Sequence, residues 1–120
     1  MIVFDTYAWI EYFAGSKKGV KVKEIVESTE QIVTPAIVLA EIKSSYLKEG
    51  KDFASRISFI SGRSSIAALN KEISLLAAEL KHKHRLYLVD AIVYATAQSM
   101  NAKLLTGDLH FKDLELIEFL

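Results

Sequence analysis

The sequence predicts an α/β fold, in which helices cover both faces of a mainly parallel sheet. Short apolar runs of β type alternate with amphipathic helical segments along the whole chain, as in repeated βαβ units. No repeat, linker or low-complexity tract interrupts this alternation. Acidic residues follow the first and fourth apolar runs, and functional side chains gather at this end of the strands in such sheets.

The bulk composition fits one globular domain. A chain of 120 residues has the usual domain size, so we expect a single domain over residues 1–120. With 51% hydrophobic and 25% charged residues, the chain is neither disordered nor fibrous. The formal net charge is +0, so any contact with a nucleic acid must be local. Cysteine is absent, which leaves oxygen and imidazole as metal ligands.

The N-terminal sequence lacks the basic and apolar regions of a signal peptide. No apolar run approaches the ~18 residues that a membrane span requires. We therefore expect a soluble, cytoplasmic protein without a membrane partner.

The first half of the chain predicts two strands and four helices. In order, they are a strand over Ile2–Phe4, helices over Tyr7–Ala14 and Val20–Ser28, a strand over Gln31–Thr34, a helix over Ala36–Lys48 and a helix that contains Phe53, Ile57 and Ile60. Pro35 suits the first turn of its helix, and Gly50 should end that helix. Ser61 and Gly62 should end the next one.

The second half predicts three strands and two helices. They are a strand over Ser65–Leu69, a helix from the N-cap Asn70 towards Lys81, a helix over Ala91–Met100, a strand over Lys103–Thr106 and an edge strand within Leu114–Phe119. Asp90 should open the second helix and Asn101 should cap its C-terminus.

Four acidic residues stand where this fold would bring them to one end of the sheet: Asp5, Glu41, Asp90 and Asp108. Two carboxylates about 4 Å apart repel by roughly 4 kcal/mol at an effective dielectric constant near 20. Four of them together need a divalent cation or bound protons. The pattern therefore indicates a hard-metal site and, as the first enzyme class, a nuclease.

Each acid also has a structural alternative. Asp5 and Asp90 could cap helices, and Asp108 could be a turn residue before the last strand. Glu41 lies between Ile37 and Val38 on an inward helix face, where a lysine could neutralise it. The agreement of all four positions favours the metal site.

An all-oxygen site favours Mg²⁺ or Mn²⁺, which keep waters and leave ligand positions for a substrate phosphate. Substrate attraction then needs cations beside the acids. The candidates for RNA binding are Lys43, Lys48, Lys81, Lys83 and Arg85, and the last three lie in a dense basic run with His82 and His84. Such a run is often only a solvated helix end. Glu11, His110 and Asp113 stay without a role.

The ordered set of motifs resembles the PIN-domain ribonucleases, and specifically the VapC toxins of toxin–antitoxin pairs. It consists of Ile-Val-Phe-Asp5-Thr6, Thr34-Pro35 leading to Glu41, Val89-Asp90-Ala91 opening a helix of small residues, and Leu105-Thr106-Gly107-Asp108 followed by Phe111. The resemblance covers essentially the whole chain.

The resemblance implies a three-layer α/β/α domain with about five strands in the order 3-2-1-4-5. It also implies that Asp5, Glu41, Asp90 and Asp108 are the catalytic and metal-binding set, with support from the hydroxyls of Thr6 and Thr106. The implied activity is that of an endoribonuclease that depends on Mg²⁺ or Mn²⁺. The implied partners are an RNA substrate, a VapB-like antitoxin and a second copy of the chain.

Two other function classes remain open. A PIN fold without activity could bind RNA or protein, although the four intact acids argue against it. A receiver-type signalling domain also carries acids at strand ends. It would have an adjacent acidic pair after its first strand, whereas Thr6 follows Asp5 here.

Overall fold

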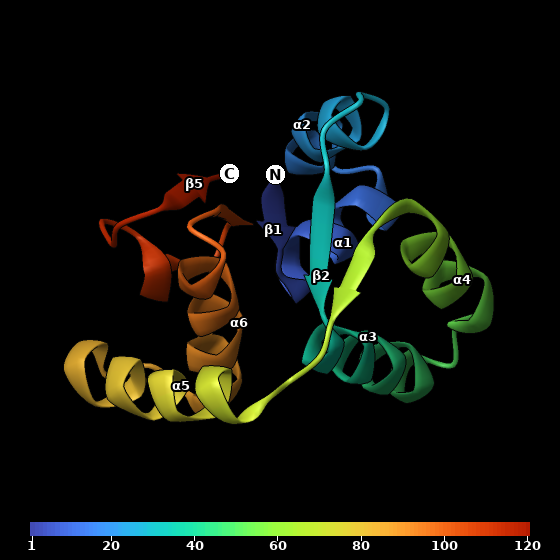
Figure 1. The fold of residues 1–120 in the computed structure, drawn as a ribbon. Coiled ribbons are helices and arrows are strands. Elements are labelled where there is room, and N and C mark those ends of the chain that lie inside the picture. Colours follow the sequence, from blue (N-terminus) through green and yellow to red (C-terminus); the bar gives the residue numbers. More distant parts are fainter.

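A computed structural model describes all 120 residues, and it contains a five-stranded parallel sheet with strand order β3-β2-β1-β4-β5 (Figure 1). The elements are β1 (Ile2–Phe4), α1 (Thr6–Ala14), α2 (Lys17–Val26), β2 (Ile32–Pro35), α3 (Ala36–Glu49), α4 (Ala54–Arg63), β3 (Ser65–Ala67), α5 (Lys71–His84), α6 (Leu88–Ser99), β4 (Lys103–Thr106), a 3-10 turn η1 (Leu109–Phe111) and β5 (Ile117–Phe119). This confirms the predicted α/β class and the strand order.

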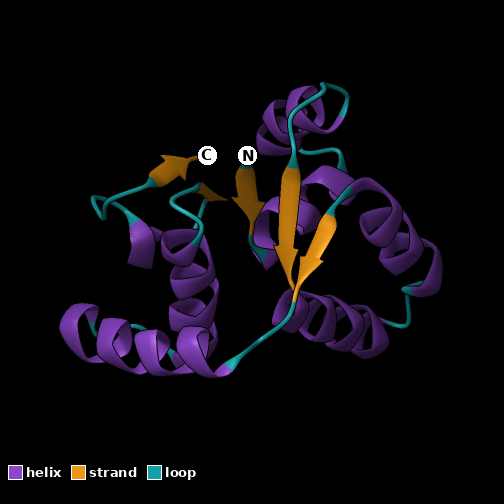
Figure 2. Ribbon diagram, viewed as in Figure 1, coloured by secondary structure: helices purple, strands orange, loops and turns teal.

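Helices flank the strands on both sides. In the view of Figure 1 and Figure 2, α1 lies behind β1 and β2, α4 lies beside β3, and α3 lies below the ends of β2 and β3, whereas α5 and α6 lie together below β4 and β5. The two halves meet at β1, which pairs with β2 on one side and with β4 on the other. Strands β2 and β3 are added on one side of β1, and β4 and β5 on the other, so the strand order changes direction at β1. The carboxyl ends of β1 and β4 therefore lie side by side at the position where parallel sheets place their functional sites. No helix is long and apolar enough to cross a membrane.

Local capping signals explain most helix boundaries. The Asn70 side chain accepts a hydrogen bond from the backbone N–H of Ile73, as expected for an N-cap. Gly50 ends α3 in the left-handed conformation with φ = 69°, and Asn101 adopts φ = 49° just after α6. Pro35 is instead the last residue of β2, directly before α3.

Several boundaries differ from the prediction. Helix α2 spans Lys17–Val26 instead of Val20–Ser28, because the Ser16 hydroxyl caps its N-terminus by accepting from the Gly19 backbone N–H. Strand β3 ends at Ala67 instead of Leu69. Helix α4 runs through Ser61 and Gly62 to Arg63, because the Arg63 guanidinium is held by the carbonyls of Val26, Ile25, Ser28 and Glu30 at 2.7–3.3 Å. Helix α6 begins at Leu88, two residues before Asp90. The basic run belongs to the last turn of α5 rather than following it.

The core is built on the apolar strands and on Trp9 of α1. Trp9 is fully buried, and its indole N–H donates to the Thr34 hydroxyl of β2 at 3.1 Å. Thr34 in turn lies 2.8 Å from the Ser64 hydroxyl before β3. This chain of polar contacts fixes α1 against the sheet and so fixes the position of Asp5, which immediately precedes the helix.

Glu11 has a structural place at the junction of α1 and α2. The Ser16 hydroxyl donates to the Glu11 carboxylate. A Cβ atom at Gly19 would come within 2.0 Å of the Glu11 carbonyl oxygen, so the close approach of the two helices requires glycine there. Glu11 therefore belongs to this junction, at the other end of α1 from Asp5.

Candidate active site

The four acids predicted from the sequence converge at the carboxyl end of the sheet, and we call this group the acidic edge. Asp5 follows β1, Asp108 follows β4, Glu41 lies in the second turn of α3 and Asp90 lies in the first turn of α6. The charges of Asp108 and Asp90 help to raise the pKa of Asp5, and those of Asp108 and Glu41 help to raise the pKa of Asp90. The acids therefore act on one another as a single electrostatic group.

Asp5 is the most buried acid, with 6% of its surface exposed. Burial raises its pKa to about 7, against the hydrogen bonds from the Thr106 hydroxyl and the Ala8 backbone N–H, which lower it. The Ala8 N–H lies 2.8 Å from Asp5 Oδ1, so Asp5 is also the N-cap of α1. The N-cap interpretation and the metal-site interpretation are thus compatible.

Asp90 is half-buried and does not cap α6, because Tyr87 occupies the N-cap position. Burial and then the neighbouring Asp108 and Glu41 raise its pKa to about 6, while His110 lowers it. The N-terminal end of the helix dipole favours a negative charge here. The predicted capping alternative is therefore wrong for Asp90, and its burial beside other acids has to be explained in another way.

Glu41 has no lysine or arginine partner within salt-bridge distance. Its Oε1 atom instead accepts a hydrogen bond of 2.6 Å from the Thr6 hydroxyl of α1. This contact joins α3 to the start of α1 and aims the carboxylate at the acidic edge. The alternative of a Glu41–lysine pair is wrong.

Asp108 is held from both sides along the chain. Its backbone N–H donates to the Thr106 hydroxyl at 3.0 Å, and its Oδ1 atom accepts from the backbone N–H of His110 at 2.9 Å. Gly107 lies between them, and a Cβ atom there would be 2.3 Å from the ring of Tyr7. Thr106, which also bonds to Asp5, therefore links the two acids that follow β1 and β4.

His110 is a site residue that the sequence did not reveal. Its Nδ1 atom lies 2.7 Å from Asp108 Oδ1, and ligand atoms of Asp90, Asp108 and His110 all lie within 4.8 Å of one another. The available signal was its position two residues after Asp108, which places both side chains on one short turn. Asp113 is exposed, at φ = 73° in the turn before β5, and joins none of these contacts.

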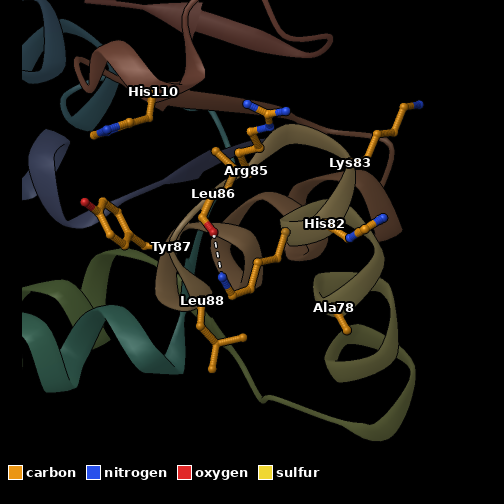
Figure 3. Close-up of a pocket in the computed structure, with 9 residues that line it drawn as sticks. Ala78, His82, Lys83, Arg85, Leu86, Tyr87, Leu88 and His110 are labelled. Atoms are coloured by element: carbon orange, nitrogen blue, oxygen red, sulfur yellow. Dashed lines mark hydrogen bonds between the residues drawn. The ribbon is translucent and has the colours of Figure 1, made fainter.

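The cations predicted to bind RNA separate into two groups. Lys43 lies over the ring of Phe53 at 4.9 Å, in an apolar groove between α3 and α4, and Lys48 is exposed in the last turn of α3. The other three line a cavity of about 970 Å³ beside the acidic edge (Figure 3). We call this surface the basic corner, and its polar and aromatic members are Lys81, His82, Lys83, Arg85, Tyr87 and His110.

His110 joins the two surfaces. Its ring contacts Tyr87 edge to face, with 5.6 Å between ring centroids, on the side of the basic corner. On the other side it bonds to Asp108 of the acidic edge. The arrangement places a row of cations beside a group of carboxylates that lack lysine or arginine partners, which suits a polyanion that must approach a bound cation.

The structure is similar to solved structures of toxin–antitoxin systems. A toxin–antitoxin complex from Klebsiella pneumoniae matches with a TM-score of 0.83 and 23% identity, covering 98% of this chain and 96% of that chain. VapBC2 from Rickettsia felis, bound to a DNA fragment from its promoter, matches with a TM-score of 0.78 and 19% identity over 99% and 98% of the chains. VapC20 from Mycobacterium tuberculosis, described as a toxin that cleaves the sarcin–ricin loop, matches with a TM-score of 0.68 and 17% identity over 97% and 92%.

At these low identities, the structural similarity shows a shared fold alone. No curated protein matches the chain. A model of the PIN domain, in contrast, matches residues 2–116, which include β1, the acidic edge and the basic corner. The chain therefore belongs to the PIN-domain family.

Proposed function

We propose that this protein is a metal-dependent endoribonuclease and the toxin of a toxin–antitoxin pair, active as a homodimer. The observation that carries the proposal is the acidic edge itself: four carboxylates meet there, and no lysine or arginine pairs with any of them. Membership of the PIN-domain family supports a nuclease. The similar VapBC structures support a VapB-like antitoxin as the partner.

The donor set fits a hard divalent cation such as Mg²⁺ or Mn²⁺. Burial, and then the neighbouring carboxylates, raise the pKa values of Asp5 and Asp90, and no lysine or arginine pairs with either acid. Carboxylate oxygens are the preferred ligands of both ions, and His110 adds a nitrogen that Mn²⁺ accepts more readily than Mg²⁺. Asp5, Glu41, Asp90 and Asp108 would hold the ion. It would polarise the scissile phosphate and lower the pKa of the attacking water.

The residues of this chain position that chemistry. Thr6 fixes the Glu41 carboxylate, and Thr106 fixes both Asp5 and Asp108, so the ligands stay in place when the substrate enters. Lys81, Lys83 and Arg85 bind phosphates next to the cleaved one. Water adds to phosphorus, one P–O ester bond of the RNA breaks, and the leaving oxygen takes up a proton, so that one phosphate end and one hydroxyl end result.

Incubation of the purified protein with a structured RNA tests this function. We expect cleavage with Mn²⁺ or Mg²⁺ and none with excess chelator. Cleavage that persists in chelator would contradict a metal-dependent nuclease. Retention of the RNA without any cleavage, in either metal, would favour an inactive PIN-fold binding module.

The partner proposal has its own test. Co-expression with a small protein encoded by the neighbouring reading frame should suppress cleavage, and the complex should be isolated intact. Cleavage that continues at the same rate in a stable complex would contradict the antitoxin role.

A further inference from the structure

Tyr87 is unusually exposed for an aromatic side chain. Seventy per cent of its surface is accessible, and Leu109 is accessible to 73%, so the two most exposed large apolar residues of the protein both border the acidic edge. Leu109 directly follows Asp108, and Tyr87 lies three residues before Asp90, which places it on the same side of the helix start. The two side chains therefore present apolar surface to solvent next to the charged site, where it is open to a ligand.

The backbone holds Tyr87 firmly despite this exposure. The preceding residue, Leu86, is buried, and its backbone N–H donates to the carbonyl of Lys81 at 3.2 Å. The Lys81 side chain donates in turn to the Leu86 carbonyl at 3.3 Å (Figure 3). Tyr87 itself begins α6 as its N-cap residue. The ring therefore extends from an ordered turn between two packed helices. Ligand binding at the ring should cost little conformational entropy of the backbone.

Two further cations line the same cavity as this ring. Lys83 and Arg85 project from the end of α5 along the same cavity, and His110 contacts the Tyr87 ring (Figure 3). Neither cation forms a salt bridge with an acidic side chain. Free cations beside an exposed aromatic ring are the combination that binds single-stranded nucleic acid, because cations neutralise phosphates while bases stack on the ring.

We propose that Tyr87 stacks on an unpaired base of the RNA substrate, next to the scissile bond, while Lys83 and Arg85 bind the adjoining phosphates. This subsite rests on the proposed ribonuclease function, and it restricts the substrate to RNA with an unpaired nucleotide beside the cleavage point. An acidic peptide fits less well, since it offers no base to the ring.

Equilibrium binding of a fluorescent 12-nucleotide single-stranded RNA tests the subsite without cleavage. All variants carry Asp90→Asn and are measured in chelator. Tyr87→Ala and Tyr87→Leu should weaken RNA binding about tenfold, because both remove the stacking surface. Tyr87→Phe should bind within twofold of the parent. Val20→Ala on α2, a matched change at another exposed apolar residue, should have no effect.

The charged part of the subsite has a separate signature. Lys83→Ala should reduce the slope of log K against log salt by about 0.7, whereas Tyr87→Ala should leave the slope unchanged. Lys21→Ala on α2 is the matched control, because Lys21 is exposed and α2 lies at the opposite end of the strands from the acidic edge (Figure 1). Inorganic polyphosphate has no bases, so it should bind the parent and Tyr87→Ala with equal affinity.

Three results would overturn the subsite. The first is an RNA affinity of Tyr87→Ala within twofold of the parent, and the second is an equal loss of affinity for duplex RNA of the same length in Tyr87→Ala. The third is polyglutamate that binds the parent more tightly than RNA does and loses this affinity in Tyr87→Ala. Failure of the nuclease proposal looks different. In that case the wild-type protein would not cut RNA in Mn²⁺, whatever the binding variants show. A protein that cuts RNA but ignores Tyr87→Ala would retain the nuclease and lose the subsite.

Discussion

The acidic edge and the basic corner lie side by side, but the protein holds them in different ways. Three of the four acids are held by hydrogen bonds: Asp5 by Ala8 and Thr106, Glu41 by Thr6, and Asp108 by Thr106 and its own turn. Lys83 and Arg85 of the basic corner are exposed at the end of α5, without acidic partners. The fold therefore fixes most of the residues that would bind a metal ion and leaves these two long side chains in water, where a polyanion can reach them.

This difference has an energetic side. Burial and mutual repulsion raise the pKa values of Asp5 and Asp90, so the acidic edge destabilises the folded protein whenever both are ionised. The basic corner carries no such cost, because its charges remain in water. A strongly perturbed pKa in a cleft is typical of a functional site, which supports our proposal that the acids carry the chemistry.

Asp90→Asn should produce the largest effect. We expect kcat for RNA cleavage to fall at least about a thousandfold, equivalent to about 4 kcal/mol, because a ligand of the ion is lost. The folded protein should be as stable as the wild type or more stable, since one member of a repulsive group is neutralised. Asp113→Asn, an exposed turn acid outside the acidic edge, is the control. Full activity of a folded Asp90→Asn protein would exclude Asp90 from the site.

The stability of the metal-free protein should depend on pH in an unusual direction. The folded-state pKa of Asp5 is raised to about 7 and that of Asp90 to about 6, so between about pH 4 and pH 8 the folded protein binds more protons than the unfolded chain. Stability should therefore fall as pH rises through these values. The Asp5 shift alone corresponds to a loss on the order of 4 kcal/mol. Denaturant unfolding at pH 5 and pH 8 measures this, and a free energy of unfolding that rises over this range would contradict the account.

Gly107→Ala should damage the acidic edge through packing. The new methyl group would overlap the ring of Tyr7, and we expect a loss of about 1–3 kcal/mol in stability. Because Gly107 precedes Asp108, metal affinity should fall as well. Gly62→Ala is the matched control, since a Cβ atom there meets nothing within 4 Å. The melting temperature without Mn²⁺ measures the loss of stability, and its increase with Mn²⁺ measures metal binding. Equal values for Gly107→Ala and Gly62→Ala would show that the Tyr7 ring moves aside without cost.

Thr6→Val should have the smallest effect. It removes the hydroxyl that holds Glu41 and preserves the shape of the side chain, so we expect activity to fall about tenfold. Thr6→Ser keeps the hydroxyl and should stay close to the wild type. Activity of Thr6→Val within twofold of the wild type would contradict a role for this hydrogen bond.

The acidic edge was predictable because its members stand at places that sequence marks clearly. Asp5 and Asp108 follow apolar strands, and parallel pairing of β1 with β4 brings strand ends together. Glu41 and Asp90 interrupt apolar helical segments, where an acid is costly without a partner. Backbone topology therefore determines which acids meet.

The basic corner was only partly predictable, because its geometry depends on tertiary packing. The density of cations between Lys81 and Arg85 was visible, but their position beside the acids depends on how α5 turns into α6. Tyr87 and His110 are 23 residues apart in sequence and meet only in the fold. The end of α4 was missed for a similar reason, since Arg63 stabilises it through carbonyls more than 30 residues away.

Titration of the protein with Mn²⁺ at pH 7.5 tests the central claim most directly, because it needs neither RNA nor a partner. Calorimetry on the wild-type, Asp90→Asn and Asp113→Asn proteins should give saturable binding to the wild type and to Asp113→Asn, with affinity at least about tenfold weaker for Asp90→Asn. The same titration should raise the melting temperature of the wild type. Equal Mn²⁺ affinity for all three proteins, or no binding at millimolar Mn²⁺, would contradict the assignment of the acidic edge as a preformed metal site.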